Sequence, residues 1–508
     1  MPFDFVRIHR SSLFFICALF FIGAVYLPSL RFDFVDKDDN FQIYDNPLVV
    51  GNTRNSSIVD NFHMTNTWTD FLLTPMTGYP TPLTILSYKA DYLIGNLNPS
   101  FFHFTNLLIH LLCAIVIYFI CLQIGLSPAA SLVAMLFFSL HPICTETVAW
   151  ITNRKTSLST MFALFSIYQM IKISKQITKP YWHFSLALLF WVLACFSKPL
   201  AICLLPLILW TAVTAKELKP LRVSFIIGSF LFVFAILKLS TIGLSGRNAL
   251  ADQTSIWVWA RECWYALGYH LELMFFLIRP ENIHLPDARP PHFNFFTDTF
   301  PFFVAAAIGM FFVFRKNKID KAWCWGAALL VLGIFPAVNI IRINRYLADT
   351  FCYLPICGLA ILAGYVFEEL KKIFSPSRIH QMIFFGLALM GLTFLTIGTL
   401  NASVKWQNGI ALRQSIVDAY PNEPAFCSDL GSAYAIWNKW DQALQTLREC
   451  EKKFPGSRAF DLAMGSVLLK LGNTAEAKER LENAKRNGVT HPVLQYNLDL
   501  IQKINEQQ

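Results

Sequence analysis

The sequence predicts an all-α protein, in which a polytopic membrane helix bundle of about eleven spans precedes a short tail of helical repeats. First, long apolar runs recur through most of the chain, and each can cross a hydrocarbon core of about 30 Å as a helix. Second, 55% of the residues are hydrophobic and only 15% are charged, which is unlike a soluble domain. Third, a polar and repetitive segment begins near residue 405.

The first apolar run follows Arg7 and Arg10, as the core of a signal peptide would. No small-residue cleavage site comes after it, and many more spans do, so we expect a retained first span. The expected spans are residues 11–30, 102–122, 127–144, 156–173, 182–197, 200–214, 223–241, 300–314, 323–341, 349–367 and 380–398.

Basic connectors orient the bundle, because cytoplasmic loops carry an excess of Lys and Arg. Such connectors follow the fourth, sixth, eighth and tenth spans, so the outer face receives the loop 31–100, the stretch 242–299 and everything beyond residue 400. The net charge of +9 therefore reflects membrane orientation and does not indicate a nucleic-acid partner. The basic residues are Lys172, Lys175, Lys179, Lys216, Lys219, Arg222, Arg315, Lys316, Lys318, Lys321, Lys371, Lys372 and Arg378.

The segment 256–279 is apolar enough to enter the membrane. One more span there would place every later basic loop on the wrong side, so we expect a re-entrant or interfacial helix instead.

The tail repeats at an interval of 34 residues, which resembles tetratricopeptide repeats; a plain helical cap is the alternative. Stacked helix pairs of this kind form a concave face that usually holds a peptide, so the tail is expected to recruit an acceptor protein. We expect two domains, residues 1–400 in the membrane and residues 405–508 on the outer, periplasmic or lumenal side. The repeated pairs are Gly431 and Gly465, Ala443 and Ala477, Leu447 and Leu481, and Pro421 and Pro455.

Most of the twelve cysteines lie inside apolar runs, where a thiol behaves as a small hydrophobic group. No Cys-x-x-Cys pair occurs, so neither a metal ribbon nor a redox motif is indicated. Cys427 and Cys450 share the tail, and the sequence leaves open whether they form a disulfide.

Three carboxylates, Asp36, Asp38 and Asp39, lie within four positions just beyond the first span. Their mutual repulsion raises the pKa of at least one of them, and such a group can act as a general base toward an acceptor hydroxyl. A solvated acidic turn is the alternative reading of the same pattern.

Cationic residues also gather at the outer ends of spans. Arg154 and Lys155 follow His141 and Glu146 in the block HPICTETVAWITNRK, and Lys198 lies in the tight turn between two spans. Arg and Lys at a membrane edge can extend to lipid headgroups, or they can clamp a phosphate. Further along, Arg342 and Arg345 precede Ala348-Asp349, so the outer face is expected to carry a basic pocket for a lipid phosphate.

An outer carboxylate cluster and an outer basic cluster together indicate one reaction class. Arg and Lys neutralise a lipid-phosphate leaving group while a carboxylate activates the attacking hydroxyl. The sequence offers no Gly-rich phosphate loop for a nucleotide, which favours a lipid-linked donor.

These blocks, in this order, resemble the multispan GT-C glycosyltransferases of the transmembrane-and-tetratricopeptide type, relatives of the protein O-mannosyltransferases. The resemblance covers nearly the whole chain. It implies a GT-C fold, a polyprenyl-phosphate sugar as donor, and protein O-glycosylation at Ser or Thr hydroxyls, without a cofactor and often without a metal. The blocks are residues 38–40, 44–47, 82–95, His103, Asn106, His110, 141–160, 197–199, 348–349 and 353–355.

The resemblance also implies roles for individual residues. Asp38 or Asp39 is expected to be catalytic, with Asp39 slightly favoured. The outer basic cluster supplies the expected contacts to the donor phosphate, Arg154, Lys155, Lys198 and Arg345. The expected supporting residues are Asp36, His103, His141, Glu146 and Asp349.

Two positions depart from the family pattern. Thr81 stands where such proteins often carry Arg or His, and Thr350 follows Asp349 where they commonly read Ala-Asp-Arg or Ala-Glu-Arg. We hypothesise that Arg345 substitutes for the second missing arginine.

Two other functional classes compete with the enzyme. The first is a non-catalytic docking protein that the bundle anchors to the membrane. The second is a transporter, which is disfavoured because the ionisable residues gather at one face and not near the midplane. The short tail favours a bacterial cytoplasmic membrane with a periplasmic site, and an endoplasmic reticulum membrane is the alternative.

Overall fold

The computed structural model describes residues 2–51, 79–175, 179–215, 256–276, 321–338, 347–374 and 377–507, together with isolated positions between 218 and 235. The chain forms two compact units, Met1–Val404 and Lys405–Gln508. All regular elements of the described residues are helical, which confirms the all-α prediction.

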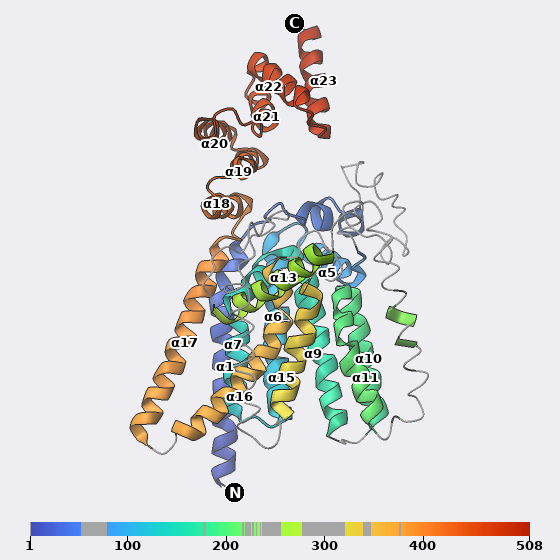
Figure 1. Ribbon diagram of the computed structural model, residues 1–508, viewed down its shortest axis with the longest axis vertical. Helices are drawn as coiled ribbons and strands as arrows, with labels where there is room; N and C mark the ends of the chain where they lie inside the picture. The colour runs from blue at the N-terminus through green and yellow to red at the C-terminus, as the bar shows by residue number, and fades with distance from the viewer. Residues whose placement is uncertain are drawn as a thin grey trace. The chain divides into compact units, whose positions relative to one another are not determined.

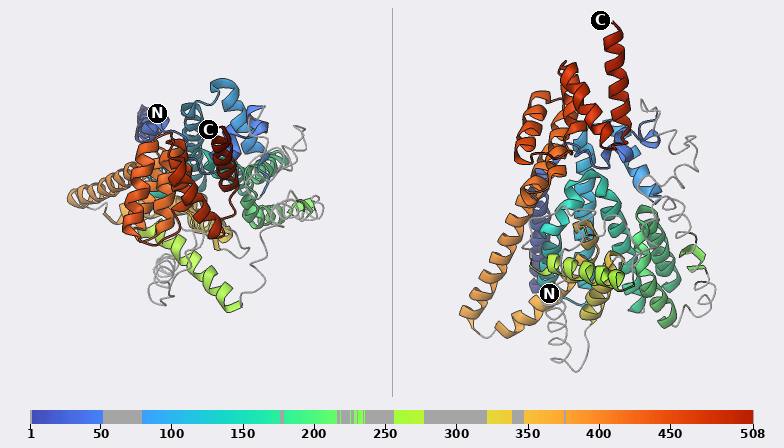
Figure 2. Two further views of the ribbon diagram at one scale, coloured as in Figure 1. Left: turned by 90° about the horizontal axis from the view of Figure 1, so that it is seen from above. Right: turned by 45° about the horizontal axis from the view of Figure 1, so that its top comes forward.

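Long helices that run side by side build the first unit (Figures 1 and 2). The central helix α6 packs against α7 and α9, while α16 packs against both α7 and α15. The long helices are α1 (Pro2–Tyr26), α6 (Pro99–Ile124), α7 (Pro128–Ser139), α9 (Arg154–Ser174), α10 (Pro180–Ser197), α15 (Lys321–Ile334), α16 (Pro355–Phe374) and α17 (Arg378–Val404).

Among the described residues, five helical segments are long and apolar enough to cross a membrane, and a bent pair of helices would make a sixth. The protein is therefore a multi-pass membrane protein. Helices α9 and α16, with 21 and 20 residues, match two further expected spans in length. The expected spans 223–241 and 300–314 lie mostly or wholly outside the described residues, so the count of eleven stays a prediction. The five segments are Ser12–Arg31, Pro99–Ile124, Pro180–Ser197, Lys321–Val338 and Arg378–Val404.

A broken helix connects α7 to α9. The chain bends by 52° between α7 and Pro142–Ala149, because Pro142 cannot continue the preceding helix. Three short turns follow in order: η3 (Pro142–Cys144), α8 (Thr145–Ala149) and η4 (Ile151–Asn153). They lead directly into the first residue of α9.

The loop after α1 contains two short turns, η1 (Leu27–Arg31) and η2 (Asn40–Tyr44), and then α2 (Pro47–Val50). A small apolar cluster fixes this loop and α5 (Pro82–Gly95) against the bundle. Its buried members are Ile43, Leu48, Val49, Ile85, Tyr88, Phe102 and Ile151.

Helix α13 (Ile256–Phe276) runs crosswise to the long helices (Figures 1 and 2). It packs against η8 (Phe335–Val338) and η9 (Asp349–Cys352), and with 21 residues it is long enough to cross a membrane but is not apolar enough. The re-entrant or interfacial position of this helix stays a prediction.

The second unit is a row of antiparallel helix pairs. In the pair α19–α20, a Cβ atom at Gly431 would lie 2.5 Å from the Leu447 side chain, and Gly465 meets Leu481 in the same way in α21–α22. Glycine is therefore needed for the close packing of each pair, at positions 34 residues apart. The helices are α18 (Gly409–Ala419), α19 (Pro424–Ile436), α20 (Trp440–Lys453), α21 (Asp461–Lys470), α22 (Thr474–Arg486) and α23 (Pro492–Gln507).

Cys427 and Cys450 form a disulfide between α19 and α20, with a Cα–Cα distance of 5.9 Å. This structure answers the pairing question that the sequence leaves open. The other ten cysteines are free thiols in the membrane unit.

Candidate active site

Three consecutive residues in the first turn of α9, Arg154, Lys155 and Thr156, point into three different surroundings. Successive residues of an α-helix point about 100° apart. Arg154 therefore enters the protein interior, Lys155 reaches the loop after α1, and Thr156 faces a cavity.

Arg154 is completely buried, and four protein groups bind its guanidinium. Nε donates to Asn106 Oδ1 at 2.7 Å, and Nη2 donates to the Phe102 carbonyl at 2.8 Å. Nη1 lies 2.5 Å from Asp91 Oδ2 and donates to Ser87 Oγ at 3.3 Å. The guanidinium has no exposed surface and already holds α5, α6 and α9 together, so its expected contact with the phosphate stays a prediction that this geometry does not support.

Lys155 lies close to the carboxylate cluster: its Nζ is 3.8 Å from Asp38 Oδ2. The Asp38 side chain is 41% exposed, whereas that of Lys155 is 10% exposed. Both Asp36 and Asp38 have positive φ angles, 55° and 67°. These left-handed residues turn the loop sharply before Asp39, at a cost of about 1–2 kcal/mol for each non-glycine residue.

Asp39 is fully buried, and its Oδ2 accepts a hydrogen bond from the Val35 backbone N–H at 2.8 Å. Burial raises the pKa of this carboxyl to about 7. The Val35 and Thr152 hydrogen-bonding groups oppose the rise in pKa, and the charges of Asp38 and Asp36 add to it less strongly than burial does. The sequence predicts a raised pKa in this cluster from repulsion, but desolvation is the larger cause.

Asp36 accepts a hydrogen bond from the Tyr44 hydroxyl. Burial, the bond to Asp36 and the surrounding carboxylates all raise the pKa of Tyr44 above its ordinary value, so the phenol stays protonated and donates. Asp36 therefore helps to shape the loop in which Asp39 lies.

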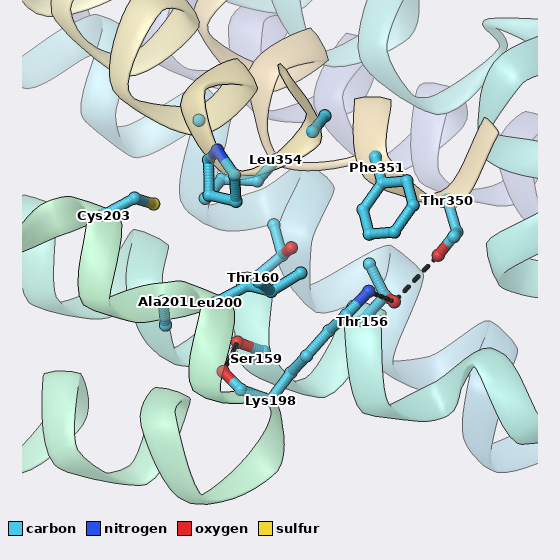
Figure 3. Close-up of a pocket in the computed structure, with 13 residues that line it drawn as sticks. Thr156, Ser159, Thr160, Lys198, Leu200, Ala201, Cys203, Thr350, Phe351 and Leu354 are labelled. Atoms are coloured by element: carbon cyan, nitrogen blue, oxygen red, sulfur yellow. Dashed lines mark hydrogen bonds between the residues drawn. The ribbon is translucent and has the colours of Figure 1, made fainter. Parts of the chain in front are cut away.

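Lys198 lies on the wall of a cavity of about 40 Å³, at the expected tight turn between α10 and η5 (Pro199–Leu204). Its Nζ donates to Thr156 Oγ1 at 2.8 Å and lies 5.0 Å from the centre of the Phe351 ring, as Figure 3 shows. The volume suits about three water-sized groups, which is nearer to phosphate oxygens than to a whole sugar. Thr156, Thr160, Thr350, Ser159 and Phe351 are among the other lining residues.

Glu146 lies in α8 and Asp349 lies in η9, and these two elements pack against each other. Glu146 is fully buried, and its Oε1 accepts a hydrogen bond from Asn153 Nδ2 at 3.2 Å. Both carboxyl groups interact electrostatically with Cys352, which places them in one region beside the cavity wall.

The two expected histidines stabilise the scaffold. His103 is buried in α6 and packs edge-on against Phe32, with ring centroids 6.1 Å apart. The Nδ1 atom of His141 accepts a hydrogen bond from the Ile143 N–H, which starts η3, and its Nε2 lies 3.2 Å from the Met274 carbonyl of α13. Arg345, the remaining expected phosphate ligand, lies outside the described residues.

Three polar residues beside these groups were not predicted as site residues: Asn153, Thr156 and Thr350. Thr156 Oγ1 and Thr350 Oγ1 are 2.8 Å apart (Figure 3), and Thr350 Oγ1 donates to Asn153 Oδ1 at 3.3 Å. The available signal was the position of Thr350, where the family pattern has arginine. Within the described ranges, no group of three or more His, Cys, Asp or Glu side chains could hold a metal ion.

The chain is similar to the protein O-mannosyl-transferase TMTC3 of Mus musculus. The two are 23% identical over 506 residues, which cover 91% of this chain and 54% of the mouse protein. TMTC3 of Homo sapiens matches with the same identity and coverage, and Tmtc2 of Drosophila melanogaster is 33% identical over 159 residues, 29% of this chain and 16% of the fly protein.

These relatives confirm the resemblance that the motif blocks indicate. The chain spans about half the length of the two TMTC3 proteins. No protein-family model matches the sequence, and no solved structure matches it.

Proposed function

We propose that this chain is a membrane glycosyltransferase that moves a sugar from a polyprenyl-phosphate donor to a Ser or Thr hydroxyl of a protein. The observation that carries the proposal is the juxtaposition at the first turn of α9. There, Lys155 approaches the carboxylate cluster and Thr156 holds Lys198 at a cavity. The printed names of the relatives add mannose as the sugar to test first.

The proposed reaction needs one proton acceptor and one centre of positive charge. The acceptor oxygen attacks the anomeric carbon of the sugar, and its proton passes to the Asp39 carboxylate. The bond from that carbon to the phosphate oxygen breaks, and the phosphate leaves with the bonding electrons. A base with a pKa of about 7 suits this proton transfer at neutral pH.

Lys155 and Lys198 are the proposed partners of the leaving phosphate. An ammonium group stabilises the negative charge that develops as the phosphate departs, most strongly in a site that excludes water. Asp38 would keep Lys155 oriented until the donor arrives, since their charged groups are 3.8 Å apart. Arg345 stays a further candidate for contact with the leaving phosphate. Arg154 stabilises the first turn of α9 from the protein interior.

The proposed location of the site is the non-cytosolic face of the membrane. Disulfides persist in oxidising compartments, so the Cys427–Cys450 bridge favours a lumenal or periplasmic tail. The basic connectors favour the same orientation. The preference for a bacterial membrane has no support in the matched relatives, which come from animals, and we favour the endoplasmic reticulum membrane.

The tail is the proposed acceptor-binding part. A groove of about 420 Å³ lies on this unit and is lined by polar side chains with the disulfide at its edge. Extended polypeptides pair well with such hydrogen-bonding groups. The groove also suits the competing docking function, so the experiment must separate the two. Its polar lining residues include Gln414, Gln442, Gln445, Thr446, Glu449 and Lys453.

The decisive experiment measures transfer of radiolabelled mannose from a polyprenyl phosphate to a Ser- and Thr-rich protein acceptor by the purified protein. We expect the double variant Asp38→Asn, Asp39→Asn to lose at least about 100-fold in rate, because general-base catalysis typically contributes 10²–10⁴-fold. The matched control is Asp33→Asn in the same loop, whose carboxylate accepts a hydrogen bond from Phe34 N–H.

Equal activity of the double variant and the wild-type protein would remove the proposed base. If the wild-type protein transfers no sugar from any polyprenyl-phosphate donor, while its tail still captures proteins, the docking function replaces the enzymatic one.

A further inference from the structure

A chain of hydrogen bonds joins two buried groups of opposite charge, the ammonium of Lys198 and the carboxylate of Glu146. Lys198 binds Thr156, Thr156 binds Thr350, Thr350 binds Asn153, and Asn153 binds Glu146. The four contacts measure 2.8, 2.8, 3.3 and 3.2 Å. All five residues are buried, and the most exposed of them, Thr350, is 6% exposed.

The hydrogen bonds of this chain all point the same way. An ammonium group can only donate, so Thr156 accepts from Lys198 and keeps its own proton for another partner. Thr350 gives its single proton to Asn153 Oδ1, so it must accept from Thr156. The Asn153 amide then donates to Glu146, which completes a chain that starts at a cation and ends at an anion.

Such polarity has an energetic consequence. Hydrogen bonds that point in one direction polarise one another, and each becomes stronger than it would be alone. Burying an ammonium is costly unless it is hydrogen-bonded. The hydrogen-bond chain gives Lys198 such a bond through Thr156, and it ends at the carboxylate of Glu146. The chain also ties α9, η9, η4 and α8 to the turn that carries Lys198.

We propose that this hydrogen-bond chain positions the Lys198 ammonium for the phosphate of the donor. Glu146 is then the anchor of the hydrogen-bond chain, and Thr350 is its central link. The inference rests on the proposed function, because it takes Lys198 as a ligand of the donor phosphate.

Thr350→Val tests the chain, because valine has nearly the same shape as threonine but cannot pass on the hydrogen bond. Thr350→Ser restores the hydroxyl. The control is Ser166→Ala, which removes another buried hydrogen bond of α9, from Ser166 Oγ to the Ala187 carbonyl at 2.7 Å, far along the helix from the cavity. Thermal melting of each variant without ligand shows whether it is folded.

The measurement is the dissociation constant of farnesyl phosphate, a short polyprenyl phosphate, for the full-length protein in detergent. We expect Lys198→Met and Thr350→Val each to weaken binding by about tenfold or more, as for the loss of a well-placed charged hydrogen bond. Thr350→Ser and Ser166→Ala should bind within about twofold of the wild-type protein.

A double-mutant cycle separates positioning from simple damage to the fold. If Thr350 acts through Lys198, adding Thr350→Val to Lys198→Met should cause no further loss. Additive losses, or wild-type affinity in Thr350→Val, would overturn the positioning role while leaving Lys198 as a phosphate ligand. Wild-type affinity in Lys198→Met would instead overturn the phosphate role of Lys198, and the positioning role would fall with it.

Discussion

At Asp39, the fold keeps a carboxyl group out of water and so favours its neutral form. The pKa is about 7 in the folded protein and 3.8 in its ordinary surroundings, a difference worth about 4 kcal/mol. Between these two values the folded state binds more protons than the unfolded state, so the contribution of Asp39 to stability is most favourable below about pH 4 and falls as the pH rises to about 7. Above pH 7 this contribution is constant.

We therefore predict that the melting temperature of the wild-type protein in detergent falls by several degrees between pH 5 and pH 8. The Asp39→Asn variant, which is neutral throughout, should lack this part of the fall, whereas Asp33→Asn should keep it. Parallel curves for the wild-type protein and Asp39→Asn would show that Asp39 is ionised at pH 5.

If Asp39 is the base, the rate of sugar transfer should rise with pH, with an apparent pKa near 7.

The surroundings of individual residues could not be predicted from the sequence. The sequence places Arg154 and Lys155 together at the start of α9, but it does not reveal which of them points inward. The structure decides this through Asp91 and Asn106, which approach from α5 and α6 and pair with Arg154. Such partners are distant along the chain, so no local pattern could predict them.

Helices α15 and α16 cross so closely that glycine is required at their contact. A Cβ atom at position 358 would lie 2.6 Å from the Gly326 carbonyl oxygen. The C-terminal end of α15 leads to Pro336 and Ala337, and the residues just before α16 include Phe351 and Leu354; all four line the Lys198 cavity. The close crossing therefore holds two walls of the cavity together.

We predict that Gly358→Ala destabilises the protein by about 1–3 kcal/mol, because overpacking forces the two helices apart. The measurement is the melting temperature in detergent. The matched control is Gly386→Ala in α17, where no atom lies within 4 Å of an added Cβ. That substitution should be neutral or slightly stabilising, since alanine is favoured over glycine in a helix. Equal effects of the two substitutions would contradict the close crossing.

The broken helix before α9 shows where prediction from local pattern ends. The apolar run at 127–144 predicts one span, but the structure ends α7 at Ser139 and continues through three short turns. Contacts from elsewhere hold these turns, such as the His141 ring against the Met274 carbonyl. These contacts come from residues that are distant along the chain. The local sequence therefore could not predict that Glu146 and Asn153 would meet beside α9.

For the whole molecule, the all-α fold class could be predicted from the sequence, whereas the number of spans stays a prediction. The hydrophobic runs predict the membrane bundle, and the 34-residue interval predicts the paired helices of the tail, because both patterns reflect burial that repeats regularly along the chain. The basic connectors predict in addition which face of the bundle is cytoplasmic. Sidedness is therefore the property of the whole chain that most needs a measurement.

We predict that the tail lies on the side opposite to the basic connectors. An epitope inserted at the Gly488 turn should resist protease in sealed vesicles that expose the cytosolic face, whereas one inserted after Lys175 should be cleaved. Alkylation of the denatured, unreduced protein should leave Cys427 and Cys450 unmodified, because an oxidising compartment preserves their disulfide. Cleavage of the tail epitope together with reactive thiols at both cysteines would place the tail in the cytosol. A tail on that side could not bring an acceptor protein to a site on the non-cytosolic face, so the proposed role of the tail would be wrong.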